Sequence, residues 1–363
     1  MIGMTDILPL LLLVLLLYGV KLPKPLRAFR TEDYLSMDTG RCQRGFFALV
    51  VVFHHLAQRT ESGAIFHFFT NVGYLAVSVF FFLSGYGLQR SYITKGESYL
   101  KTFLRKRLTS ILIPYVIITA FFWLVNCIDG RVYSLGDIFN AIIDGRPIAS
   151  HSWYIINILI FYLFYWLFMV ICREKYLLMI LCGTVWYALY VFFCVKLGYG
   201  EWWYNTSFLP VIGMLWATYE PRILDFLKKT YIFVAPMTWA AFITLFVFKL
   251  RITAQGIAAS ISMSLITGIL FALSVVLLSL KVQIGNKALH FLGRISLELY
   301  LSQGLFIELF RSHVIYIENE MLWCVTVLGC TILFGWGLHW VLQRSLYRWA
   351  KVVTPSAPDR NPR

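Results

Sequence analysis

The segment between Arg44 and Gln58 is the part of the sequence best suited to acid–base chemistry. It reads GFFALVVVFHHLA and places His54 and His55 in an otherwise apolar run. An imidazole titrates near neutral pH, and an ionisable group inside an apolar helix is a functional candidate. At 1.5 Å per residue, His55 lies about 16 Å along a helix from Arg44. The pattern predicts that the His55 imidazole lies deep in the protein and that the Arg44 guanidinium lies below it, at the cytoplasmic entrance. We predict that His55 and Arg44 form the catalytic pair.

Two alternatives apply to these histidines. The pair can be interfacial, with both rings hydrogen-bonded to neighbours. Adjacent helical residues also point about 100° apart, so only one ring can face a given slot, and His54 competes with His55 as the base.

A basic cluster follows in the run FLRKRLTSILIPY, which contains Arg105, Lys106 and Arg107. Plain positive charge at the cytoplasmic end of a membrane span would explain it. The functional interpretation is a clamp for phosphates, because arginine binds them bidentately. Together with Arg44, these residues are predicted to hold an anionic cytoplasmic ligand beneath His55.

Five further residues complete the candidate site. Ser84 and Gly85 are small residues of the helix GYLAVSVFFFLSGYGLQR; they favour close helix packing, or they line a slot for the ligand. His151 and Trp153 open the run HSWYI at the outer interface, and Glu298 stands inside an apolar helix, where it needs a partner or a proton. We assign His151, Trp153 and Glu298 to the acceptor side. The seven cysteines show no metal-type spacing, so no metal is predicted.

The composition indicates that these residues belong to a membrane protein. The chain is 59% hydrophobic and only 14% charged, whereas a soluble domain has about 25% charged residues. Its net charge of +14 suits cytoplasmic loops rather than nucleic acid, for which no module is recognisable. We predict an all-α, multi-pass protein of the plasma membrane.

A span needs about 20 mostly apolar residues. By this criterion we predict about eleven transmembrane helices, with ten as the alternative. The predicted spans are 3–20, 45–57, 71–89, 108–127, 152–171, 176–196, 203–219, 231–248, 256–280, 288–310 and 321–342. They form one transmembrane domain over residues 1–352, followed by a polar, disordered cytoplasmic tail over 353–363.

The basic residues predict the orientation. The connections after the odd-numbered spans, counted together with Arg294 at the start of the tenth span, contain 25 of the 32 lysines and arginines. The opposite side contains Arg59, Arg131, Arg146, Lys196, Lys249, Arg251 and Arg311. Because positive loops stay in the cytoplasm, the N-terminus is predicted outside and the C-terminus inside.

Six fragments, in this order, resemble acyltransferase family 3 of membrane proteins over most of the chain. They are Arg44-Gly45 with His55 eleven residues after the arginine, VGYLAVSVFFFLSGY, FLRKRL followed by IPY, HSWYI, LPVIGML and LGRISLELYLSQ. The resemblance implies ten or so helices and a donor such as acetyl-CoA, or another acyl-CoA, reached from the cytoplasm. It also implies a carbohydrate acceptor of the cell envelope or one destined for export.

The resemblance also implies roles for individual residues. Arg44 and His55 correspond to the essential pair of the first family motif, and Arg105 and Arg107 to basic residues implicated in donor binding. Gln303 stands where relatives often have histidine, so a role for that histidine does not carry over. Some relatives carry a fused extracytoplasmic hydrolase-like domain that is not found here, which implies direct transfer or a separate partner protein.

Sequence and resemblance together predict a membrane O-acyltransferase, most simply an O-acetyltransferase. The alternative is a proton-coupled transporter or flippase for a lipid-linked glycan, with intramembrane His and Glu as a proton relay. Transporters often show internal repeats with matched broken helices, which we do not find in this sequence.

Overall fold

The computed structural model describes residues 3–22, 28–172, 175–251 and 256–353, and these are all-α, as predicted. In chain order the helices are α1 (Ile7–Leu17), α2 (Met37–Ala57), α3 (Ala64–His67), α4 (Gly73–Lys95), α5 (Ser98–Ile128), α6 (Leu135–Ile143), α7 (Trp153–Cys172), α8 (Tyr176–Lys196), α9 (Leu209–Arg251), α10 (Ile257–Ser279), α11 (Lys287–Arg294), α12 (Ser296–Leu309) and α13 (Glu320–Val353). Short 3-10 helices cover Met4–Asp6, Phe68–Asn71 and Glu201–Trp203. The predicted tail over 353–363 lies outside the described residues except for Val353.

Several helices are long and apolar enough to cross a bilayer, so the chain is a multi-pass membrane protein. Within the described ranges there are six: α5, α7, α8, α9, α10 and α13 over Glu320–Ser345. A seventh candidate is the pair of Ala64–Asn71 and α4, which together would form one span that bends by 48° at the break. The segment predicted at 3–20 forms shorter helices over Met4–Leu17, and α2 starts at Met37 rather than residue 45.

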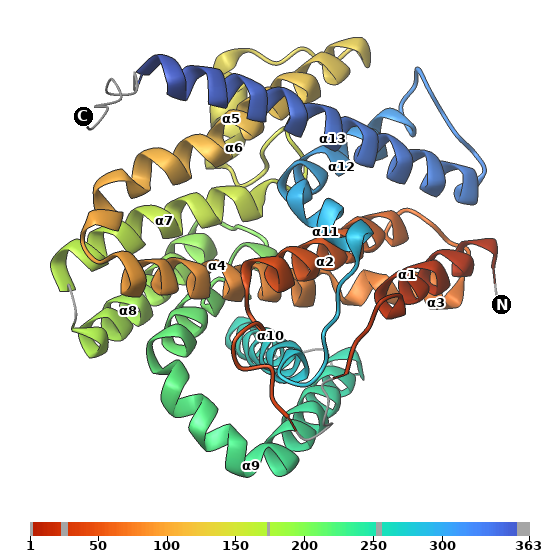
Figure 1. The fold of residues 1–363 in the computed structure, drawn as a ribbon. Coiled ribbons are helices and arrows are strands. Elements are labelled where there is room, and N and C mark those ends of the chain that lie inside the picture. Colours follow the sequence, from red (N-terminus) through yellow and green to blue (C-terminus); the bar gives the residue numbers. More distant parts are fainter. Residues whose placement is uncertain (1–2, 23–27, 173–174, 252–255, 354–363) are drawn as a thin grey trace, which may run out of the picture.

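The regions predicted as spans 203–219 and 231–248 belong largely to one helix. α9 runs for 43 residues and contains Pro221 and Pro236. Figure 1 shows it bent into two limbs below the rest of the molecule. At 1.5 Å per residue it is about 65 Å long, enough for two crossings of about 30 Å. Proline removes a backbone hydrogen bond and kinks a helix, which accounts for a bend within one continuous helix.

Two other stretches also differ from the sequence expectation. The predicted span 288–310 is broken at Ile295, whose backbone leaves the helical region between α11 and α12. The long connection before residue 151 contains α6, which begins with a capping box formed by Ser134 and Asp137. Both stretches contribute residues to the cavities described below, Arg294 and Ser296 from the first and Arg146 and Pro147 from the second.

The two helices that carry the predicted site pack in the middle of the fold. In Figure 1, α2 and α4 lie between α9 on one side and α5 and α13 on the other. α4 packs closely on α9, because Gly85 meets the backbone of Pro210 and Gly213 meets the backbone of Phe82. α2 packs equally closely on α11, where Gly45 lies against the backbone of Leu289. Small residues at these points allow the backbones to approach.

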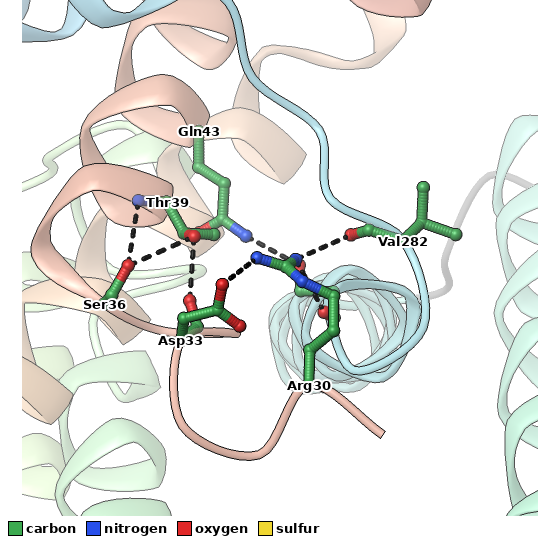
Figure 2. A network of polar contacts seen from close by, with 7 residues as sticks. Arg30, Asp33, Ser36, Thr39, Gln43 and Val282 are labelled. Atoms are coloured by element: carbon green, nitrogen blue, oxygen red, sulfur yellow. Dashed lines mark hydrogen bonds and ion pairs between the residues drawn. The ribbon is translucent and has the colours of Figure 1, made fainter. Parts of the chain in front are cut away.

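A polar network fixes the start of α2 to the end of α10. The Ser36 hydroxyl accepts a hydrogen bond from the Thr39 amide at 3.3 Å and so caps α2. Arg30 pairs with Asp33 at 2.6 Å and donates to the backbone oxygens of Ser279 and Val282. Figure 2 shows this network together with Gln43, the residue before Arg44. The buried Gln43 amide donates to the Ser279 hydroxyl at 2.8 Å, so the first turns of α2 are held firmly beside Arg44.

Candidate active site

A cavity of about 680 Å³, which we call the inner cavity, contains the Arg44 end of the candidate site. Its basic lining residues are Arg44, Arg90, Lys95, Arg107 and Arg294. No aspartate or glutamate is among its lining residues in the described part of the chain. Five cationic side chains without a lining carboxylate make a site suited to a polyanion.

The basic cluster of the sequence splits in the structure. Arg107 lines the inner cavity and donates to the Tyr99 hydroxyl at 3.4 Å. Arg105 and Lys106 are exposed and are not among the lining residues. Successive residues of α5 point in different directions, so only part of a contiguous run can face one cavity.

The two small residues of α4 also face different ways. Ser84 lines the inner cavity. Gly85 is buried against α9, where a side chain would overlap the Pro210 backbone, and it does not line the cavity. Packing is therefore the role that the structure gives Gly85.

A second cavity of about 540 Å³, the outer cavity, contains the histidines. His54 and His55 from the end of α2 line it together with His151 from the turn before α7. Trp153 is also in its lining. Arg44 and His55 lie on one helix, as the sequence predicts, but they line two different cavities along α2.

Hydrogen bonds determine which nitrogen of His55 carries its proton. His54 Nδ1 lies 2.9 Å from the Phe69 carbonyl oxygen, which can only accept, so Nδ1 is the donor. In the neutral ring His54 Nε2 is then an acceptor and takes a hydrogen bond from the Gln58 amide at 3.2 Å. This orientation aims the Gln58 oxygen at His55 Nδ1, 3.2 Å away, so that nitrogen donates. His55 Nε2 is left with the lone pair of a base.

His151 is held against His55. The two rings stack with centroids 3.6 Å apart and planes inclined by 25°. The His151 backbone has φ of 65°, a left-handed conformation that is unusual outside glycine, and the Tyr300 hydroxyl donates to its carbonyl at 2.6 Å. Burial, with smaller contributions from His54 and Arg59, lowers the pKa of His151 to about 3. His151 is therefore neutral at physiological pH.

Tyr300 brings the two cavities together. It comes from α12 and is in the lining of both the inner and the outer cavity. Its ring meets that of Tyr154 edge to face, with centroids 5.2 Å apart, and Tyr154 also lines the inner cavity. Tyr300, with Tyr154 packed against it, therefore lies at the boundary between the Arg44 side and the His55 side.

Two polar residues of α12 have other surroundings. Glu298 is buried and pairs with His339 of α13 at 2.8 Å, and it lines neither cavity. The partner that a buried carboxylate needs is therefore supplied by a helix–helix contact. Gln303 is fully buried and donates to the Tyr300 carbonyl at 3.1 Å. The described residues contain no cluster of three or more potential metal ligands.

Comparison with known families decides the assignment. A family model described as an acyltransferase domain, Acyl_transf_3, matches residues 42–340. The chain belongs to acyltransferase family 3. The match starts two residues before Arg44 and includes α2 from Cys42 onward, both sides of the candidate site and the Glu298–His339 pair. No curated protein and no solved structure matches the chain.

The family assignment confirms the resemblance drawn from the sequence and makes the chain a membrane acyltransferase. Sequence reasoning missed Gln58, Tyr300 and Arg294. Arg294 and Tyr300 stand in the motif GRISLELYLSQ, from which the sequence singled out only Glu298 and Gln303. Gln58 stands three residues after His55 and four after His54, and a side chain one helical turn away is a recognisable hydrogen-bonding partner.

Proposed function

We propose that this acyltransferase moves an acyl group, most simply acetyl, from cytoplasmic acyl-CoA to a hydroxyl of a cell-envelope or exported carbohydrate. It would do so as an O-acetyltransferase in the plasma membrane. The eleven-span arrangement, with the basic side in the cytoplasm, belongs to this proposal. It places the inner cavity at the cytoplasmic face and the outer cavity toward the exterior.

The observation that carries the proposal is the division of one helix between two cavities. Arg44 of α2 lines the inner cavity and His55, further along the same helix, lines the outer one. Tyr300 lines both. A donor with an anionic head and a long thin arm fits this arrangement, because its phosphates and its thioester must lie far apart.

The donor's phosphates would bind in the inner cavity. Arg44, Arg107 and Arg294 supply planar guanidinium groups that bind phosphate bidentately. Arg90 is held in place by Glu220 at 3.3 Å, and the Tyr34 and Tyr86 hydroxyls donate to that carboxylate. The pantetheine arm would pass Ser84 and the Tyr154–Tyr300 boundary to reach His55.

The reaction at His55 would be a general-base acyl transfer. Nε2 takes the proton of the acceptor hydroxyl while its oxygen bonds to the thioester carbonyl carbon. The carbon–sulfur bond then breaks, and the thiolate recovers the proton from the imidazolium to leave as the free thiol. Positioned acid–base groups contribute roughly 10²–10⁴-fold to such steps. During this step the His55 ring becomes positively charged. The stacked His151 ring is neutral, so it does not repel that charge.

The test is a mass-spectrometric comparison of envelope glycans from a deletion strain and complemented strains. The wild-type chain should restore an ester that the deletion lacks, and His55→Ala should not. His67→Ala is the matched control, because His67 is an exposed histidine of α3 outside both cavities. Full ester with His55→Ala at matched expression would overturn the base assignment. A glycan moved across the membrane without any lost ester would favour the transporter alternative.

A further inference from the structure

A third cavity, of about 670 Å³, lies beside the outer cavity. Four arginines line it: Arg59, Arg131, Arg146 and Arg311. We call it the arginine pocket. All four are among the seven basic residues that the sequence assigns to the non-cytoplasmic side. Most of the sparse positive charge of that side is therefore gathered at one place.

The charges in the arginine pocket do not cancel. Its acidic lining residues are Asp129 and Glu308. Asp129 is already paired with Arg131 at 2.7 Å, and Arg311 is engaged by the rings of Tyr316 and Trp323. Arg59 and Arg146 are exposed and form no ion pair within the described ranges of the chain. Four guanidinium groups against two carboxylates leave an excess of two positive charges.

The arginine pocket adjoins the proposed reaction centre. Arg146 and Pro147 line both the arginine pocket and the outer cavity. Arg59 follows directly after Gln58, whose side chain bonds to His55. A ligand group bound by Arg59 and Arg146 would therefore hold the rest of the molecule next to His55.

Both segments that carry these arginines are anchored. The Glu320 carboxylate of α13 accepts from the Glu61 and Ser62 amides at 2.7 and 3.0 Å, which fixes the loop after Arg59. The Trp203 indole donates to the Gly145 carbonyl at 3.2 Å, just before Arg146. The backbone that carries the two arginines is thus fixed before an anion binds, which leaves only their side chains to be ordered.

We propose that the arginine pocket binds an anionic group, carboxylate or phosphate, carried by the acceptor, so that the acceptor is an acidic rather than a neutral carbohydrate. This inference rests on the proposed function, which supplies the carbohydrate acceptor. Arg59 and Arg146 bind the anionic group and position the hydroxyl of the same or the next sugar at His55 Nε2. Bidentate arginine contacts give both affinity and orientation to such groups.

The test measures binding to the purified full-length chain in detergent, with CoA in excess so that the inner cavity is occupied. The probes are tetragalacturonate for carboxylate, inorganic pyrophosphate for phosphate, and maltotetraose as a neutral oligosaccharide of equal length. At least one anionic probe should bind the wild type, more weakly as salt rises. The double variant Arg59→Gln/Arg146→Gln should weaken it by about tenfold or more, since hydrogen bonds to charged groups are the stronger ones. The tighter anionic probe identifies the kind of group.

Arg251→Gln is the matched control, because Arg251 is an exposed arginine of the same predicted side that lines none of the three cavities. It should bind the anionic probes like the wild type. The proposal is overturned if maltotetraose binds as well as both anionic probes, or if the double variant binds them undiminished. The latter would mean that the arginines serve only to balance Asp129 and Glu308.

A parallel titration with acetyl-CoA separates this inference from the proposed function. Acetyl-CoA should stabilise the wild type, the double variant and Arg251→Gln to the same extent, because its site is the inner cavity. If acetyl-CoA binds none of the three proteins while the anionic probes still bind the wild type, the acyltransfer proposal is contradicted. The anion site in the arginine pocket is then still supported. If acetyl-CoA binds all three proteins but neither anionic probe binds, only the proposal of an acidic acceptor is contradicted.

Discussion

At the scale of single residues, the chemistry depends on one lone pair. The carbonyl of Phe69 sets the tautomer of His54, His54 sets the orientation of Gln58, and Gln58 sets the tautomer of His55. Each step follows from which atoms can donate and which can accept. The relay leaves His55 Nε2 unprotonated and gives Gln58 the role of a positioning residue.

Replacing Gln58 tests the relay. Gln58→Leu removes the acceptor for His55 Nδ1, so the ring can adopt either tautomer and rotate. We expect kcat for acyl transfer to fall about tenfold, the equivalent of one lost hydrogen bond, with KM for acyl-CoA unchanged. Steady-state kinetics on membranes check this, with Gln283→Leu as a control outside both active-site cavities. An unchanged kcat would show that His55 does not depend on Gln58.

His151 makes stability depend on pH in a defined direction. Its pKa falls from the ordinary 6.5 to about 3 on burial. Between these values the unfolded chain binds a proton that the folded chain does not, so stability falls as the pH drops below 6.5. From pH 7 to 5 the loss from this residue is about 2 kcal/mol.

Thermal unfolding in detergent at pH 7 and pH 5 measures this effect. The fall in Tm should be clearly smaller in His151→Gln than in the wild type, while the exposed-histidine variant His67→Gln should behave like the wild type. An equal fall in all three proteins would contradict a neutral His151.

At the scale of elements, α2 acts as a rigid carrier of the two ends of the site. The network around Arg30 and Gln43 fixes its start to α10, and Figure 2 shows these contacts. Glu320 fixes the loop after its end to α13. A straight helix held at both ends keeps Arg44 and His55 at a constant separation.

The close contact of α4 with α9 is the second structural requirement. Gly85→Ala would force a methyl group into the Pro210 backbone, and overpacking of this kind typically costs about 1–3 kcal/mol. Gly87→Ala is an internal control on the same helix, because a methyl group there meets nothing within 4 Å. We expect a lower Tm in detergent for Gly85→Ala than for Gly87→Ala. Equal Tm values would mean that the two helices can move apart without loss.

At the scale of the whole molecule, the proposed function needs the two arginine-lined cavities to open on opposite sides of the membrane. In a cysteine-free background, Arg146→Cys and Arg294→Cys place single thiols at exposed positions of the arginine pocket and the inner cavity. A membrane-impermeant maleimide should label Arg146→Cys in intact cells and Arg294→Cys only after permeabilisation. Labelling of both thiols from outside would contradict the orientation.

Sequence patterns predicted the parts of this account that depend on local composition. Apolar runs predicted an all-α protein. The rise of about 1.5 Å per residue predicted the distance between Arg44 and His55 along one helix. The prolines that bend α9 are visible in the sequence. The break at Ile295 and the direction of Gly85, by contrast, involve contacts between helices far apart in sequence. Single-sequence reasoning has no access to such contacts.

The same limit applies to the site itself. Arg107 and Ser84 were found because they lie in recognisable runs, whereas their neighbours Arg105, Lys106 and Gly85 face elsewhere. The stacking of His151 on His55 joins α2 to a turn almost one hundred residues away. Only packing in three dimensions reveals that pair and the position of Tyr300 between the cavities.

The central claim is that donor binding and chemistry are separated along α2, and one paired measurement tests it most directly. Acetyl-CoA binding, followed as thermal stabilisation in detergent, and acyl transfer, followed as product, are measured for Arg44→Gln and His55→Ala. We predict that Arg44→Gln loses most of the stabilisation by acetyl-CoA, whereas His55→Ala keeps it and loses roughly 10²-fold or more in transfer. If His55→Ala also abolishes acetyl-CoA binding, or if Arg44→Gln binds it normally, the separation is contradicted.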